Sequence, residues 1–206
     1  KRRLGISRKP LIAVPNHLVV QWARAFYNLY PSARILAATP ADFTLKNRRR
    51  LLARIAPGDF DASIIGHTSL GFIETPPEDL RLIIDEKVEE LESALKTMRA
   101  NDESKRTQGQ IEKKLKTYTE RLEEMAERTT DQIGVNLKEM GVDDITVDEL
   151  HEFKNLEYST AGERVVGMND PNGSKKAFDL YAKVRGIQSR KGSFTGATGT
   201  PVSNSL

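Results

Sequence analysis

The stretch VDELHEFKN, residues 147–155, indicates the fold more clearly than any other part of the sequence. The apolar run from Ile145 to Val147 predicts a short buried strand that leads into it. Asp148 and Glu149 follow at the carboxyl end of that strand, the edge of an open α/β sheet where ligands bind. An adjacent Asp and Glu suit nucleotide hydrolysis, because the first can hold magnesium while the second orients or deprotonates the attacking water. The alternative interpretation is that both carboxylates belong to an ordinary solvated loop.

A zinc site is a second interpretation of the same residues. His151 and Glu152 begin like the HExxH helix of zinc proteases. That motif needs a second histidine at the position that Asn155 occupies here, so one required ligand is missing. The sequence therefore argues against a zinc protease.

The four residues from Asp148 to His151 resemble the DEAH-type Walker B box of superfamily two helicases, with Leu150 where that family usually has alanine. The continuation Phe153-Lys154-Asn155 resembles the Swi/Snf-type DNA translocases in particular. This resemblance implies a first RecA-like lobe that binds ATP and magnesium. It implies catalytic roles for Asp148, which would hold magnesium, and for Glu149, with His151 sensing what the carboxylates hold.

The composition narrows the class of protein. The chain has 206 residues, 38% hydrophobic and 30% charged, which is enough for one core and an appendage. It has no apolar run near the roughly 20 residues that a membrane span needs, and we expect no membrane partner. The absence of cysteine excludes disulfides and thiol catalysis, and it is compatible with a cytoplasmic location. The net charge of +3 permits a polyanionic partner without requiring one.

The amino-terminal part predicts the repeating unit of a parallel α/β sheet. Residues 11–14 form an apolar run that Pro15 stops, and Asn16 is expected to cap the helix that follows. We expect Trp22 to be a core residue, because it lies in the apolar stripe of this helix. The stripe consists of Leu18, Val19, Trp22, Phe26 and Leu29.

Two loops of this part resemble helicase motifs that contact the DNA backbone. KPLIAVPNH, residues 9–17, resembles motif Ia, which implies contacts from Pro15, Asn16 and His17. A plain helix cap with an exposed histidine is the alternative. Further strands are predicted at residues 34–39 and 62–67, and the sequence from His67 to Leu70 resembles motif Ib, which implies contacts from His67 and Thr68. Lys154 and Asn155 are further DNA-binding candidates by the same resemblance.

A basic run, KNRRR at residues 46–50, opens a helix that is completed by Leu51, Leu52 and Ile55. Four cations within five residues can face phosphates, which supply sequence-independent affinity for nucleic acid. A solvated helix face is the alternative.

Residues 76–130 predict a helical hairpin inserted between the third and fourth strands. Each helix has one apolar seam, as in an antiparallel coiled coil, and the segment between them holds no large apolar residue. A DNA-guiding arm, a partner-docking arm, a lever and a purely stabilising insertion all remain open. The seams are Leu80, Ile84, Val88, Leu91, Leu95 and Met98 in the first helix, and Ile111, Leu115, Tyr118, Leu122 and Met125 in the second.

The carboxyl-terminal part predicts a helix over residues 175–187 and a strand over residues 194–197. TGTPVSNS, residues 198–205, follows and resembles motif III of the same superfamily. The resemblance implies that Thr198, Gly199, Thr200 and Ser203 couple the nucleotide state to DNA and to a second motor lobe. The hydroxyls of Thr198 and Thr200 are chemically able to hydrogen-bond with His151.

Together these features predict an α/β fold, a three-layer RecA-like parallel sheet of the P-loop NTPase type, with the helical hairpin inserted. Residues 1–75 and 131–206 form the lobe in this scheme, and residues 76–130 the insertion. Residues 141–149 and 176–180 resemble a bacterial and phage branch linked to adenine-specific DNA methylases and antirestriction, which implies a methylase or restriction-related partner. No GxxxxGK[ST] phosphate loop is present, so we expect a fragment that lacks this loop and the second lobe and is inactive alone. A nucleotide-independent interaction module is the alternative function, and RNA remains open as the nucleic acid.

Overall fold

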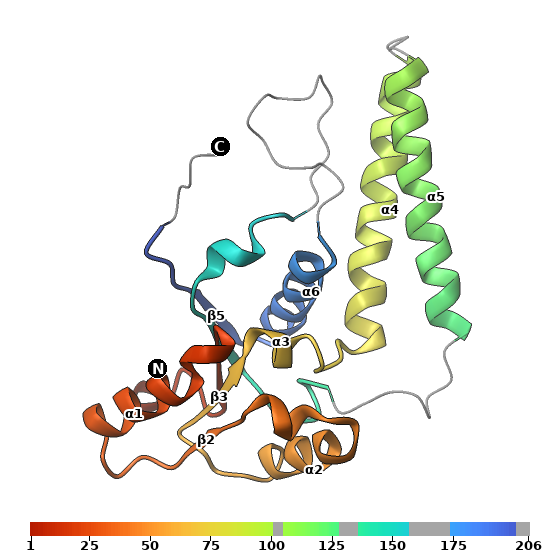
Figure 1. Cartoon of the computed structure of the whole chain (residues 1–206). Coiled ribbons are helices and arrows are strands. Elements are labelled where there is room, and N and C mark those ends of the chain that lie inside the picture. Colours follow the sequence, from red (N-terminus) through yellow and green to blue (C-terminus); the bar gives the residue numbers. More distant parts are fainter. Residues whose placement is uncertain (101–104, 128–135, 157–173, 201–206) are drawn as a thin grey trace.

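The structure is a computed structural model that describes residues 1–100, 105–127, 136–156 and 174–200. Its centre is a five-stranded sheet in the order β2-β3-β1-β4-β5, in which every pairing is parallel (Figure 1). The strands are β1 (Pro10–Val14), β2 (Ile35–Ala37), β3 (Ala62–Gly66), β4 (Asp144–Val147) and β5 (Ser193–Gly196). All five lie where the sequence predicts them, because each is an apolar or β-branched run bounded by turn residues.

Helices cover both faces of the sheet. Side chains alternate along β1, so that Leu11 and Ala13 face one side and Ile12 and Val14 face the other. The first side packs against α2 (Leu45–Ile55) and α6 (Lys175–Ser189), and the second against α1 (Val19–Leu29). The result is the three-layer RecA-like α/β fold that the sequence predicts.

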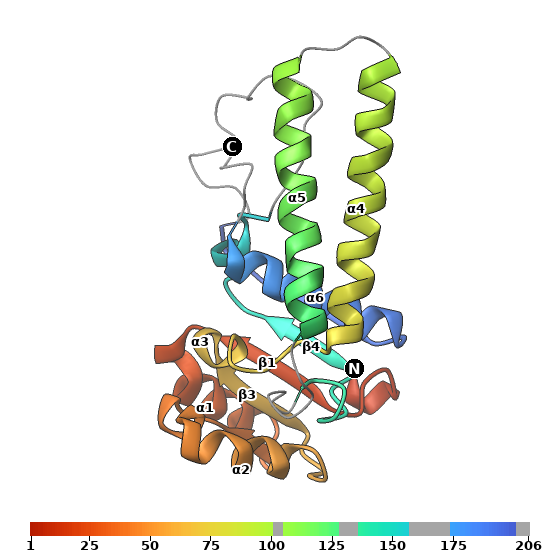
Figure 2. The same ribbon diagram turned by 90° about the vertical axis from the view of Figure 1, so that its right-hand side faces the viewer.

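The helical hairpin between β3 and β4 is also confirmed. It consists of α4 (Pro77–Ala100) and α5 (Lys105–Glu127), which lie side by side and antiparallel and extend away from the sheet (Figures 1 and 2). Leu80 is only half-buried, and the side chains of Leu122 and Met125 lie outside the described ones. Other predicted seam residues pack together between the helices: Ile84, Val88, Leu91, Leu95, Met98, Ile111, Leu115 and Tyr118.

The base of the hairpin is attached to the lobe through α6. Arg190 donates to Asp79 across 2.7 Å and Arg185 donates to Glu86 across 2.8 Å. Phe178 of α6 packs against the apolar cluster of the hairpin. A movement of α6 would therefore displace the base of the hairpin.

Two details of the first helical segment differ from the prediction. Asn16 does not cap α1, because a 3-10 turn, η2 (Asn16–Leu18), precedes that helix and the Asn16 side chain bonds Thr68 instead. Leu29, the last residue of α1, is 73% exposed and not part of the core. In the described part of the chain, no helix is both long and apolar enough for a membrane span.

Candidate active site at the carboxyl edge of the sheet

Parallel pairing brings the carboxyl ends of the strands to one edge. Val14 of β1 is in register with Gly66 of β3, and Val147 of β4 is in register with Gly196 of β5. The segments that follow these residues carry the predicted site residues, so the topology gathers them at this edge.

Asp148, the first residue after β4, is held by three neighbouring elements. Its main-chain N–H donates to the carbonyl oxygen of Ala13 in β1 across 2.9 Å. Its own carbonyl oxygen lies 2.9 Å from Nε2 of His67, which must be the donor because a carbonyl only accepts. The indole Nε1 of Trp22 donates to carboxylate Oδ2 across 3.2 Å. The position of this carboxylate is therefore set by tertiary contacts.

Glu149 occupies a backbone conformation that side-chain-bearing residues rarely adopt. Its φ of 51° and ψ of 49° place it in the left-handed region, which costs of order 1–3 kcal/mol and is concentrated at functional sites. This turn starts η5 (Leu150–Phe153) and directs the carboxylate toward His151, whose Nδ1 is 3.1 Å from Oε2 of Glu149.

His151 also connects the acid pair to the segment after β5. Its Nδ1 lies 3.0 Å from Oγ1 of Thr198, one of the two threonines whose hydroxyls the sequence names as partners of His151. Thr200 reaches this group differently, by donating its main-chain N–H to Thr198 Oγ1 across 3.2 Å. Gly199 is exposed beside them, and Ser203 lies outside the described residues.

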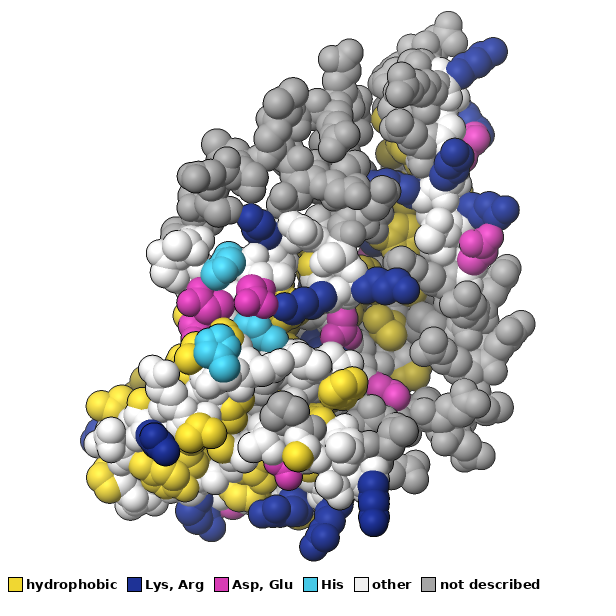
Figure 3. Space-filling view, viewed as in Figure 1, with side chains coloured by type: hydrophobic (Ala, Val, Ile, Leu, Met, Phe, Trp, Pro, Cys, Tyr) yellow, Lys and Arg dark blue, Asp and Glu magenta, His cyan; other side chains and the backbone are white. Residues whose placement is uncertain are grey.

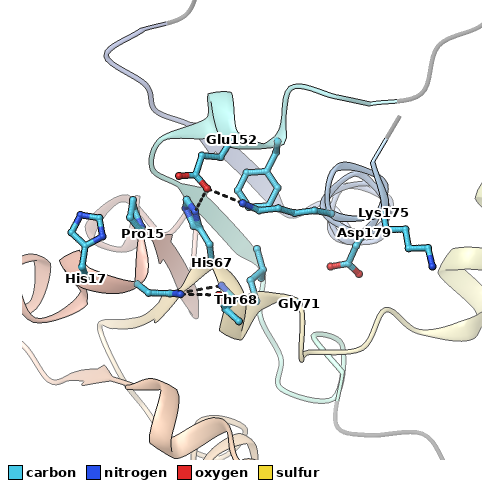
Figure 4. Close-up of a pocket in the computed structure, with 12 residues that line it drawn as sticks. Pro15, His17, His67, Thr68, Gly71, Glu152, Lys175 and Asp179 are labelled. Atoms are coloured by element: carbon cyan, nitrogen blue, oxygen red, sulfur yellow. Dashed lines mark hydrogen bonds and ion pairs between the residues drawn. The ribbon is translucent and has the colours of Figure 1, made fainter. Parts of the chain in front are cut away.

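A cavity of about 570 Å³ opens beside this group at the same edge (Figure 4). Segments after β1, β3 and β4 and the first turns of α6 form its walls. Its lining consists of Pro15, Asn16, His17, His67, Thr68, Leu70, Gly71, Glu152, Phe153, Lys175, Lys176 and Asp179. The residues that resemble motifs Ia and Ib therefore share one cavity, which the resemblance alone did not require.

Two of these loops are joined directly. The side-chain amide of Asn16 donates to Thr68 Oγ1 across 2.7 Å, and the main-chain N–H of Thr68 donates back to Asn16 Oδ1 across 3.3 Å. Gly66 permits this approach, because a Cβ at that position would lie 2.2 Å from Asn16 Oδ1. His17 is exposed next to this pair.

His67, Glu152 and Lys176 form a second group of polar contacts in the lining of the cavity. His67 Nδ1 lies 3.4 Å from Oε2 of Glu152, and Lys176 donates to the same oxygen across 2.8 Å. The Lys176 ammonium holds the pKa of Glu152 below its ordinary value, against the effect of partial burial, and His67 acts in the same direction. The ring of Phe153 packs edge-on against His67, and the Lys176 ammonium lies over this ring, 4.2 Å from its centroid.

Histidine and acidic side chains lie next to one another on this face, with lysine and arginine side chains beside them (Figure 3). The sequence of the chain matches, over residues 1–206, a family described as a probable helicase domain. The chain belongs to this family. Among curated proteins, no sequence matches it significantly.

The donor set of the helicase domain suits a magnesium ion that is shared with a nucleotide. In the described part of the chain, no three His, Cys, Asp or Glu side chains are grouped as a metal site. Magnesium is usually bound through one or two carboxylates together with substrate phosphates and water. Asp148 fits this role, because one of its carboxylate oxygens accepts from Trp22 and no hydrogen bond from the described residues reaches the other.

The remaining predicted residues lie on the surface of the helicase domain and do not line the cavity. Lys154 and Asn155 are exposed, and the carbonyl oxygen of Asn155 accepts from the N–H of Ser174 across 2.7 Å. Lys46 and Arg50 are exposed on α2 and do not line the cavity.

Sequence reasoning missed five site residues that carry a polar or charged side-chain group: Trp22, Glu152, Lys175, Lys176 and Asp179. For Trp22 a signal was present, since an indole N–H in a half-buried stripe needs an acceptor. The lysines stand at the start of a predicted helix, but no local pattern indicates that this helix end faces the cavity.

Proposed function

We propose that this helicase domain is the first motor lobe of an ATP-dependent DNA translocase or helicase. The observation that carries the proposal is the Asp148-Glu149 pair after β4, connected through His151 to Thr198 after β5. A nucleotide hydrolase needs an acid pair whose geometry responds to neighbouring loops. The continuation to Lys154 and Asn155 supports the Swi/Snf type. Residues 141–149 and 176–180 resemble the bacterial and phage branch linked to DNA methylases, and they support that branch.

In the proposed reaction, Asp148 would hold the metal and Glu149 would orient and deprotonate the attacking water. Magnesium, when bound with ATP, supplies the positive charge that offsets the charge on the phosphates. His151 keeps the Glu149 carboxylate in place through its 3.1 Å contact, and the same nitrogen contacts Thr198 Oγ1. A change in the segment after β5 would thereby alter the position of the base.

The cavity is the proposed contact for the nucleic-acid backbone. Asn16 and Thr68 supply polar groups on one wall, and His17 and Lys175 are exposed at its rim. Contacts of this kind position a protein on phosphates without reading base sequence. We propose double-stranded DNA as the polymer, because the Lys154-Asn155 extension resembles DNA translocases.

The test is steady-state ATP hydrolysis in a two-lobe protein, in which these 206 residues are joined to a phosphate loop and a second lobe. Double-stranded DNA is expected to stimulate hydrolysis more than single-stranded RNA. Glu149→Gln is expected to lower the rate by about 10²-fold or more, since it removes the general base. The chain by itself is expected to be inactive, because it has no phosphate loop.

Glu92→Gln is the matched control, because Glu92 is exposed on α4, away from the cavity. It is expected to leave the rate unchanged. Wild-type rates in the Glu149→Gln protein, or no hydrolysis with either polymer, would replace the motor assignment with a nucleotide-independent interaction module.

A further inference from the structure

The carboxylate of Asp148 depends on one side chain for its orientation. The main-chain bonds to Ala13 and from His67 hold the backbone of Asp148 in place, but they leave rotation about the side-chain bonds free. Among the described residues, only Trp22 donates a hydrogen bond to the carboxylate, at Oδ2 across 3.2 Å. Trp22 therefore decides which oxygen of Asp148 is available.

Trp22 is itself held rigidly enough for this task. It lies on α1 with its ring packed against the apolar cluster between that helix and the sheet, which includes Ile12, Val14 and Ile64. The indole N–H is a donor only and cannot exchange roles. Its direction is consequently determined by the packing of α1 on the sheet, and Asp148 is the acceptor that it meets.

We propose that Trp22 is a positioning residue that holds Oδ2 of Asp148 and thereby presents Oδ1 to a divalent cation. This proposal rests on the function proposed above, because it assigns the metal to Asp148. Hydrogen bonds that orient a metal-binding carboxylate typically contribute 10- to 100-fold to metal affinity or activity. A tryptophan that the sequence predicts to be a core residue thus acts on the reaction through Asp148.

The hydrogen bond can be detected without any enzymatic assay, because the chain contains a single tryptophan. The ¹H–¹⁵N spectrum of the 206-residue chain is therefore expected to contain one indole resonance. We expect this proton to exchange slowly with water and to shift and exchange faster in Asp148→Ala. Added Mn²⁺ is expected to broaden the resonance in the wild type and not in Asp148→Ala. An indole resonance that is identical in both proteins would overturn the proposal.

The consequence for the reaction is measured as the Mg²⁺ dependence of ATP hydrolysis in the two-lobe protein. Trp22→Phe keeps an aromatic ring and removes the donor. We expect it to raise the Mg²⁺ concentration needed for half-maximal rate about 10-fold, with most of the rate recovered at saturating Mg²⁺. Phe26→Leu is the control, because Phe26 packs on the same cluster. It is expected to lower thermal stability without changing the Mg²⁺ requirement.

The outcomes separate this proposal from the proposed function. If Glu149→Gln abolishes hydrolysis while Trp22→Phe has the wild-type Mg²⁺ requirement, the motor assignment stands and the positioning role is wrong. If Glu149→Gln hydrolyses ATP normally, the function assigned to the acid pair is wrong, and the role of Trp22 in metal binding is lost with it.

Discussion

His67 Nε2 donates to the main-chain carbonyl oxygen of Asp148 across 2.9 Å. His67 begins α3 (His67–Leu70), which forms a wall of the cavity, and Asp148 begins the acid pair. One buried imidazole, 7% exposed, therefore joins the proposed nucleic-acid contact to the proposed metal ligand. In the structure this residue is better placed to transmit a contact than to make one with DNA.

His67→Phe tests this link. Phenylalanine can retain the edge-on packing against Phe153, but it removes the hydrogen bond to Asp148 and the 3.4 Å contact between Nδ1 and Glu152. We expect the free energy of unfolding, measured with urea, to fall by about 1–3 kcal/mol, the cost of an unpaired buried polar group. The factor by which saturating DNA stimulates ATP hydrolysis is expected to fall as well. His17→Phe is the control, since His17 is exposed, and it should change the affinity for DNA rather than the stimulation factor. An unchanged factor in His67→Phe would exclude the link.

Gly66→Ala tests the junction between the loops after β1 and β3. The new Cβ would lie 2.2 Å from Asn16 Oδ1, so the exposed Asn16 side chain must turn away and lose its bonds to Thr68. The closest contact is with a side-chain end, and the Asn16 Cα at 3.3 Å must yield only slightly. We therefore expect a modest loss of stability and a several-fold weaker binding of DNA, measured by fluorescence anisotropy. Gly109→Ala in α5 is the control, as nothing lies within 4 Å of its Cβ. Equal affinity in both variants would show that the junction has no part in binding.

Asp179 and Lys183 form an ion pair in α6. We expect removal of one partner to lower the free energy of unfolding much more than removal of the other. The Lys183 side chain is fully buried, whereas that of Asp179 is 37% exposed. Burial lowers the pKa of Lys183 and raises the pKa of Asp179, and each partner opposes the shift of the other. Asp179→Asn leaves the buried ammonium without its hydrogen-bonded carboxylate, so that Glu74 is the remaining acidic group that favours its charged form. The free energy of unfolding is expected to fall by about 3–5 kcal/mol. Lys183→Met leaves a carboxylate that water reaches, so a cost below about 1.5 kcal/mol is expected.

Urea denaturation of both variants provides the comparison. The folded pKa of Lys183 lies below its unfolded value, so stability rises as pH increases from the folded pKa toward the unfolded one. This rise should be larger in total and begin at lower pH in Asp179→Asn, because Asp179 no longer favours the charged ammonium and the folded pKa of Lys183 falls further. Equal costs for the two variants would contradict the assignment of the buried charge to Lys183.

The hydrogen bonds of Asp143 predict that the folded state loses stability in acid. Partial burial raises the pKa of this carboxyl, but the main-chain N–H groups of Arg8 and Lys9 and the hydroxyl of Ser7 donate to it, and the net result is a lowered pKa. Its stabilising effect is therefore complete above the unfolded pKa, about 3.9, and is lost as pH falls through the lower folded value.

Asp143→Asn is expected to reduce the free energy of unfolding by about 1–3 kcal/mol at neutral pH, because it weakens three hydrogen bonds to a charged group. The difference from wild type should shrink as pH falls below the unfolded pKa. Asp85→Asn, on the exposed side of α4 beside Arg81, is the control and should show little effect at any pH. A difference that is independent of pH would contradict the lowered pKa.

Much of the fold follows from local patterns. Apolar runs bounded by proline, glycine or charged residues predict the five strands, because a buried parallel strand has few polar positions. Helical spacing of apolar residues predicts α4 and α5 as a pair. The same local patterns failed at Asn16, where a distant partner, Thr68, competes with the helix end for the side chain.

The sequence by itself determined that an acid pair follows a buried strand and that a histidine stands close by, because these are features of neighbouring residues. The tertiary structure alone decided that β1 lies between β3 and β4, which brings His67 and Trp22 to Asp148. It also decided that α6 directs Lys176 toward Glu152. Such contacts join residues far apart in the chain, and their directions depend on how each helix packs on the sheet, which no local periodicity specifies.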